Sequence, residues 1–407
     1  MAKSEVMLTN VEIKSHISYS LQVNRWFLLP IGAWPLANTS NAMLKILAWL
    51  HILVCVILIS IIMLPCLLYI LIEEKNVKLK LNAVGPLLHR VMGTVNYWTL
   101  IMRSDDIRKC IRHMGTDWRI VRTAEDRDIM MQHAKFGRFI ASICAVIMQG
   151  GAFFFSIAKA VKTTNFTVGN NTYTMHPMTC PIYSKFIDTR FTPVNEIMLT
   201  VQFMSTFVAS CSTVGACSLA AVFAMHACGQ LNVLYVWLDD LAKYQEKGSR
   251  ETQRKLAVAV EHHLRILSFI KCVESIMHKA SLAELAGCTI NMCLLGYYCI
   301  MAWQAFSAVK IISYIIVYAS MCFNIFIFCY IGEVIIEQCK HVGEMAYMTN
   351  WYELPHKTSR GFVLIIIRSS TVIKITAGKL FQLSIATFGD VIKTSFAYLN
   401  LLRSMTM

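Results

Sequence analysis

The chain has 407 residues, of which 56% are hydrophobic and 15% are charged, and its net charge is +14. A soluble domain carries about 25% charged residues, so a composition this apolar, arranged in long blocks, excludes an ordinary soluble protein. The basic residues lie between the apolar blocks, where they would flank membrane spans, and we therefore expect no nucleic-acid partner. The common catalytic motifs and metal-ligand spacings are missing from the sequence, so we expect no metal, no cofactor and no enzyme activity.

The apolar blocks predict the fold class. Residues 1–42 are predicted to be a cytoplasmic or interfacial segment, because a short Pro-containing apolar stretch there is bracketed by Trp26 and Trp34. Residues 46–72 contain no Asp, Glu, Lys or Arg, and about 20 such residues are enough to cross a bilayer. We predict an all-α integral membrane protein with seven transmembrane helices near residues 43–72, 79–101, 134–160, 194–226, 281–305, 311–332 and 375–404.

Lysine and arginine are unevenly distributed between the connecting segments. If the N-terminus is cytoplasmic, the inner segments hold 25 basic residues and the outer segments hold 9. Cytoplasmic loops are rich in Lys and Arg, so this bias predicts a cytoplasmic N-terminus and an extracellular C-terminus. Two glycosylation acceptors, Asn165 and Asn170, fall in the loop 161–193, which this orientation places outside the cell.

The second predicted span is the least hydrophobic, since it contains Asn82, His89, Arg90 and Asn96. Polar residues within a membrane helix usually face the bundle interior or a water-filled cavity. We therefore expect this span to form a cavity wall, although a span packed on all sides would show the same composition.

The predicted cytoplasmic stretches have the pattern of helices. Residues 102–138 and 238–280 are charged and nearly free of Gly and Pro, which suggests helical extensions of the spans that form an anchor region. The paired histidines His262 and His263 are predicted to lie on a solvated face of such an extension. Residues 333–374 add a cytoplasmic anchor segment whose aromatic side chains suit either internal packing or a subunit contact: Tyr347, Trp351 and Tyr352.

The last segment, residues 375–407, carries polar or small residues at helical spacing with a single bulky apolar residue among them. If several chains present this stripe to a common axis, its polar positions line a water path, a ring of Leu401 forms a hydrophobic gate and Asp390 favours cations. The same stripe could instead pack against its own bundle. Its members, spaced alternately by four and three residues, are Asp390, Thr394, Ala397, Leu401 and Ser404.

The C-terminal third resembles the seven-helix insect odorant receptors. The resemblance rests on Gly332 to Pro355 and Leu364 to Ser404, and on the Gly-Ala-Trp-Pro of residues 32–35 near the N-terminus. Within these segments the matching features are the Tyr-x-x-x-Trp-Tyr run, the Arg-Ser pair, the Thr-Ala-Gly-Lys run and the final Leu-Leu-Arg-Ser. Strong similarity covers roughly residues 330–405, and the middle of the chain matches in its pattern of spans.

This resemblance implies an odorant-gated, non-selective cation channel in the plasma membrane of olfactory sensory neuron dendrites. The expected assembly is a tetramer whose last helices line one pore, formed with the family's shared co-receptor, so that this chain is the ligand-tuning subunit. The resemblance also places the constriction on Leu401, with Ser404 one turn further out. Residues 43–332 would form the six-helix ligand-binding bundle.

The expected ligand is a small volatile odorant held in the outer half of that bundle. Such a pocket should be apolar and aromatic, with a few polar groups that fix the orientation of the ligand. The candidates in the outer halves of spans two to six are His89, Met92, Gly151, Phe154, Phe155, Gln202, Thr206, Tyr298, Met301, Tyr314 and Tyr318.

Three other functions fit the sequence less well. A gustatory-type channel would share the architecture, and ligand polarity cannot be read from the sequence. A secondary transporter would show internal repeats and Gly/Pro-broken helices, and the two halves of the chain show no repeat. A G-protein-coupled receptor has the opposite orientation in the membrane.

Overall fold

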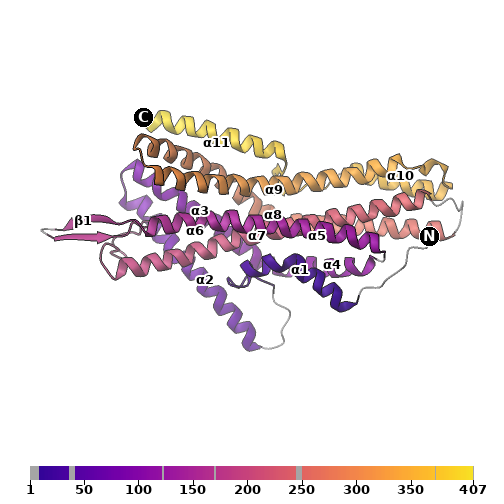
Figure 1. Ribbon diagram of the computed structural model, residues 1–407, viewed down its shortest axis with the longest axis horizontal. Helices are drawn as coiled ribbons and strands as arrows, with labels where there is room; N and C mark the ends of the chain where they lie inside the picture. Colours follow the sequence, from indigo (N-terminus) through magenta and orange to yellow (C-terminus); the bar gives the residue numbers. More distant parts are fainter. Residues whose placement is uncertain are drawn as a thin grey trace.

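The computed structural model describes residues 9–35, 42–121, 123–168, 171–243, 250–371 and 373–406 (Figure 1). The described part of the chain is almost entirely helical, with two short antiparallel hairpins. The elements are α1 (Asn10–Leu28), α2 (Ala42–Leu68), the π-helix η1 (Tyr69–Glu73), α3 (Val77–Met102), α4 (Ser104–Ile120), α5 (Ala124–Cys144), the π-helix η2 (Ala145–Gln149), α6 (Gly150–Ala160), β1 (Thr164–Val168), β2 (Asn171–Met175), α7 (Val194–Lys243), α8 (Arg250–Gln304), α9 (Ala308–Met348), the 3₁₀ helix η3 (Trp351–Glu353), α10 (His356–Ser370), β3 (Thr376–Ala377), β4 (Phe381–Gln382) and α11 (Ile385–Thr406).

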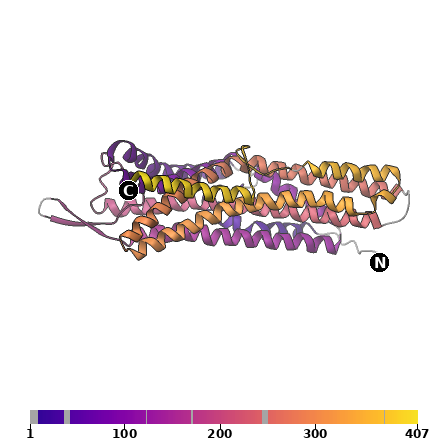
Figure 2. The same ribbon diagram turned by 90° about the horizontal axis from the view of Figure 1, so that it is seen from above.

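The helices form an elongated bundle in which α7, α8 and α9 run along most of its length (Figures 1 and 2). One end carries the β1–β2 hairpin and the end of α11, and the opposite end carries α10, the end of α7 and the start of α8 (Figure 1). We call the first end the hairpin end and the second the anchor end. The halves of the bundle next to them are the hairpin half and the anchor half. The hairpin of the predicted outer loop and α10 of the predicted anchor segment therefore lie at opposite ends of the molecule.

Each predicted span coincides with a helix. Five helical segments of the described residues are long and apolar enough to cross a membrane: 42–73, 124–160, 194–243, 250–304 and 308–348. The remaining two spans correspond to α3 and α11, which are more polar. The predicted start of the last span, residue 375, is wrong by ten residues, because α11 begins at Ile385. A β3–β4 hairpin precedes it, with a turn at Gly378 and Lys379, whose φ angles of 63° and 62° are incompatible with a helix.

The centre of the bundle is α7, in which every residue from Val208 to Leu231 is buried. Small residues allow its neighbours to approach closely. A Cβ atom added at Gly93 of α3 would lie 2.6 Å from the Cβ of Ala209, and the Ser212 hydroxyl donates a 2.7 Å hydrogen bond to the Gly93 carbonyl. The contact between α3 and α7 thus depends on the missing side chain of Gly93.

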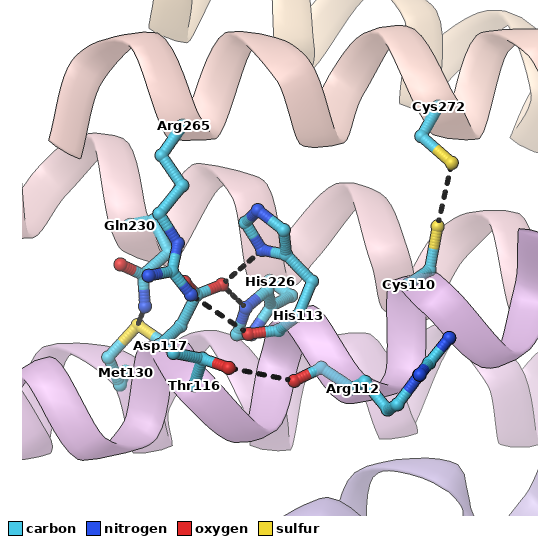
Figure 3. A network of polar contacts seen from close by, with 10 residues as sticks. All are labelled: Cys110, Arg112, His113, Thr116, Asp117, Met130, His226, Gln230, Arg265 and Cys272. Atoms are coloured by element: carbon cyan, nitrogen blue, oxygen red, sulfur yellow. Dashed lines mark hydrogen bonds and ion pairs between the residues drawn. The ribbon is translucent and has the colours of Figure 1, made fainter. Parts of the chain in front are cut away.

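The anchor half is held together by a buried carboxylate, Asp117 of α4 (Figure 3). One of its oxygens accepts hydrogen bonds from His226 Nε2 at 2.8 Å and His113 Nδ1 at 3.1 Å, and the other pairs with Arg265 Nη2 at 2.8 Å. Burial alone would raise the pKa of Asp117, but the hydrogen bonds from the two histidines lower it below its usual range. The carboxylate therefore stays ionised and links α4 to α7 and α8.

The predicted solvated position of His262 and His263 is wrong. Both side chains are buried where α8 packs inside the anchor half, and the His262 ring lies 4.8 Å from the ring of Trp237 of α7. Neither nitrogen of His262 has a hydrogen-bond partner. Burial lowers the pKa of each histidine to about 4, so both are neutral in the folded protein near neutral pH.

Gly93→Ala should destabilise the protein by about 1–3 kcal/mol, because the new methyl group overlaps the backbone of Ala209. The measurement is thermal unfolding of the purified protein in detergent. Gly150→Ala is the matched control, since no atom lies within 4 Å of a Cβ added at Gly150. Equal melting temperatures for the two variants would contradict the close packing of α3 against α7.

The protein should lose stability between pH 6.5 and pH 4, because the unfolded histidines bind protons there and the folded ones do not. Each of His262 and His263 should lower the free energy of unfolding by about 1.4 kcal/mol at pH 5.5. This loss of stability disappears as the pH rises above 6.5. His262→Phe keeps a ring beside Trp237 without a titratable group, so its melting temperature should depend less on pH. An unchanged pH dependence in this variant would show that His262 is solvated.

Candidate functional site

A cavity of about 100 Å³ lies between the helices in the hairpin half of the bundle. Its walls come from α3, the α6 segment with η2, α7, α8 and α9, and Thr179 of the outer loop closes one side. The lining is mainly apolar, with aromatic residues on α6, α8 and α9 and methionines on α3 and α9. Such a space suits a small, largely apolar molecule.

Seven of the eleven predicted ligand residues line this cavity. Two of them show how the walls are built. Gly151 of α6 packs so closely against Ser320 of α9 that a Cβ atom there would lie 3.0 Å from the serine Cβ. Tyr298 turns its hydroxyl away to donate to the Leu81 carbonyl, so it contributes mainly its ring. The seven residues are His89, Met92, Gly151, Phe155, Thr206, Tyr298 and Tyr314.

The other four predicted residues lie outside the cavity lining. Phe154 is 41% exposed on the outer surface of α6, because successive helical residues point about 100° apart and its neighbour Phe155 faces inward. Gln202 is buried but holds the outer loop, since its side-chain oxygen accepts from the Thr179 amide at 3.0 Å. Met301 and Tyr318 are half-buried in helix contacts, against the Leu294–Tyr298 stretch and against Ser395 of α11 respectively.

The second span forms a cavity wall, as its polar residues suggested. Arg90 of that wall has a buried, charged side chain with several hydrogen bonds. Its side chain is 1% exposed. Nη1 donates to the Cys180 thiol at 2.9 Å and to the Pro86 carbonyl at 3.3 Å, and Nη2 donates to the Thr206 hydroxyl at 2.9 Å. These contacts tie α3 to α7 and to the outer loop.

Glu284 of α8 lies in the lining but was missed in the sequence. Its carboxylate accepts hydrogen bonds from the amide groups of Asn96 and Asn324 and from the Thr213 hydroxyl at 3.4 Å. The sequence did contain an indication of this site, because Glu284 is the one charged residue in the predicted span 281–305. A buried acid needs such partners, so the cluster joins α3, α7, α8 and α9 at the inner end of the cavity.

The last helix lies on the outside of the bundle beside α8 and α9 (Figure 1). Its packed face includes Val391 and Ser395, which are buried, and Leu399, whose side chain meets Gly296 of α8. Its outward face remains uncovered in the single chain, and Leu401 on that face is 57% exposed. All five residues of the predicted stripe are exposed: Asp390, Thr394, Ala397, Leu401 and Ser404.

Of the predicted anchor aromatics, Tyr347 lies in the last turn of α9, and Trp351 and Tyr352 lie in η3. Tyr347 and Tyr352 are 64% and 66% exposed, whereas Trp351 is half-buried and donates its indole N–H to the Tyr347 carbonyl at 3.2 Å. Of the two glycosylation acceptors, Asn165 belongs to β1 in the hairpin and Asn170 lies outside the described residues.

Metal binding finds no support in the described ranges, where no group of three or more His, Cys, Asp or Glu side chains could hold an ion. The paired acids Asp105 and Asp106 instead form ion pairs within α4, with Arg108 at 2.9 Å and Lys109 at 2.9 Å.

The model of the family "7tm Odorant receptor" matches residues 76–396 of the chain. Odorant receptor 10 of Aedes albopictus is 23% identical over 260 residues, which cover 60% of this chain and 68% of that protein. Odorant receptor 83a of Drosophila melanogaster is 23% identical over 146 residues, covering 36% of this chain and 32% of the relative. Odorant receptor 82a of the same species is 26% identical over 155 residues, covering 38% and 40%. The matched regions thus span from about a third to two thirds of these relatives.

Two solved structures of the insect olfactory receptor OR5 from Machilis hrabei share the fold. The complex with eugenol superposes with a TM-score of 0.76 at 13% identity, covering 98% of this chain and 100% of the other. A second structure of the same receptor gives a TM-score of 0.74 at 15% identity, covering 97% of this chain and 98% of the other. The predicted all-helical architecture is therefore confirmed over nearly the whole chain.

Proposed function

Because the chain belongs to the 7tm odorant receptor family, we propose that it is the ligand-tuning subunit of an odorant-gated, non-selective cation channel. The observation that carries the proposal is the mainly apolar cavity between the helices in the hairpin half of the bundle. Membership in a receptor family agrees with the prediction that the chain is not an enzyme. It also favours this function over the gustatory, transporter and G-protein-coupled alternatives.

The proposed assembly is a tetramer with the family's co-receptor in the plasma membrane of olfactory neuron dendrites, with the N-terminus in the cytoplasm. The uncovered polar face of α11 supports a shared pore, because an exposed stripe with Asp390 and Thr394 would be unfavourable against lipid. Leu401 on that stripe would form the hydrophobic gate. The exposed Tyr347 and Tyr352 would contact a neighbouring subunit at the anchor end.

The affinity for a ligand should be modest. Burial of an eight-carbon chain yields about 6 kcal/mol at ~0.8 kcal/mol per CH₂. Micromolar binding needs about 8 kcal/mol, and immobilising the ligand opposes binding further. Polar contacts in the cavity must therefore supply part of the binding free energy.

The direct test is whole-cell current in cells that express the chain with and without the co-receptor, with G-protein signalling blocked. An odorant panel should evoke a prompt cation current that survives the block and requires the partner subunit. Surface labelling of the protein is the control for delivery. A protein that reaches the surface and gives no current with any odorant would argue against the proposal.

Phe155→Ala should raise the half-maximal odorant concentration by about 10-fold, since the loss of one aromatic wall removes about 1.4 kcal/mol of contact with the ligand. Phe154→Ala is the matched control, because its ring is on the outer surface of the same helix. The measurement is the dose response of the odorant-evoked current. Equal shifts in the two variants would contradict ligand binding in this cavity.

Leu401→Ala should increase the current in the absence of odorant, because a smaller and less apolar ring at the constriction holds water more readily. Phe396→Ala serves as the control, since Phe396 is 53% exposed on the same helix but lies off the stripe. The readout is the part of the current without odorant that a cation-channel pore blocker removes. If Phe396→Ala produced the leak and Leu401→Ala did not, the pore would lie on another face of α11.

A further inference from the structure

The outer part of the cavity carries positive charge without an acidic partner. Two cationic side chains, Arg90 of α3 and Lys159 of α6, are in the lining. In the part of the chain that the structure describes, no ion pair joins either of them to a carboxylate. The Lys159 ammonium group instead lies 5.9 Å from the centre of the Phe155 ring, which offers only a weak attraction.

Some hydrogen-bond donors of Arg90 have no partner. A guanidinium group has five N–H donors, and the contacts of Arg90 with Cys180, Pro86 and Thr206 use three of them. The Nε–H group is buried without a hydrogen-bond partner, and Nη2 has a second hydrogen besides the one that faces Thr206. Nε and Nη2 form one edge of the guanidinium fork, and such an edge can bind both oxygens of a carboxylate.

The acid in the lining does not neutralise this charge. Glu284 is bound to Thr213, whereas Arg90 is bound to Thr206. The two threonines are seven residues apart on α7, which is about 10 Å along a helix. Glu284 also already accepts from two asparagine amides, so it belongs to the inner end of the cavity and Arg90 to the outer end.

The thiol of Cys180 can balance only part of the positive charge in the cavity. Its hydrogen bond with Cys66, together with the positive charge of Arg90, lowers the pKa of Cys180 below its usual range. Lys159 adds a second positive charge, so one thiol cannot balance both cations. A buried cation without a full counter-charge is unfavourable, and an anion entering the cavity would relieve this.

The rest of the lining suits a hydrocarbon chain. The lining includes the aliphatic residues Leu294 and Leu295 of α8 and Val317 of α9, together with Met321 of α9. A molecule with an anionic head at Arg90 would therefore bury its tail among aliphatic side chains.

We propose that the cavity selects small aliphatic carboxylic acids, whose carboxylate binds the Nε and Nη2 edge of Arg90 near Lys159. This inference rests on the proposed function, because it assigns the ligand class of the same cavity. The acid supplies both the hydrophobic contact of its tail and the polar contact that a purely apolar odorant lacks.

The experiment compares four eight-carbon probes on cells that express the receptor with its co-receptor: the carboxylic acid, its methyl ester, the primary alcohol and the alkane. The acid should activate the wild-type receptor at the lowest concentration. Arg90→Met should raise the half-maximal concentration of the acid by about 10-fold to 100-fold and shift the ester by less than about threefold. Arg90→Lys should give an intermediate loss, because it keeps the charge but not the paired donors.

A second pair of variants covers the case in which Arg90→Met does not reach the surface. Lys159→Met should weaken the response to the acid by about threefold, as expected for a partly screened charge. Lys162→Met, an exposed neighbour outside the lining, should not.

The outcomes separate the ligand class from the function itself. Current with neutral odorants but not with the acid, or equal potency of acid and ester in the wild type, overturns the inference and leaves the proposed function standing. An acid response that neither Arg90→Met nor Lys159→Met alters also overturns the inference. No current with any odorant, from a receptor labelled at the surface, overturns the proposed function and the inference with it.

Discussion

The whole bundle depends on the burial of α7, a helix of 50 residues whose middle is covered by protein on every side. A helix without a lipid-facing or solvent-facing side must use small side chains and satisfy its own hydroxyl groups. Ser212 and Ser218 do so by donating to backbone carbonyls at 2.7 Å and 2.6 Å. The α3, α5, α8 and α9 helices can then pack closely around one axis.

The same helix connects the two halves of the molecule. Thr206 and Thr213 of α7 bind the charged residues at the two ends of the cavity, and His226 binds Asp117 in the anchor half. One continuous helix thus contacts both the cavity in the hairpin half and Asp117 in the anchor half. By contrast, α11 packs against the bundle through one face only.

Much of the fold could be predicted, because long apolar blocks separated by basic segments have few alternative arrangements. The sequence gives the depth of a residue in the membrane but not the direction in which it points, which is why Phe155 lines the cavity and Phe154 does not. Burial of His262 depends on packing against Trp237 of a distant helix, and no local pattern reports such a contact. Glu284 could be seen in the sequence as a lone charge. Its hydrogen bonds could not be predicted, because they depend on where Asn96 and Asn324 lie in the folded bundle.

The measurement that tests the account most directly is an electron cryomicroscopy structure of the receptor assembled with its co-receptor and an activating odorant. The account predicts ligand density between Phe155, Tyr298 and Tyr314, and a central pore lined by the α11 stripe with Leu401 at its narrowest point. Ligand density at another place in the bundle, or a Leu401 side chain that faces lipid, would contradict it.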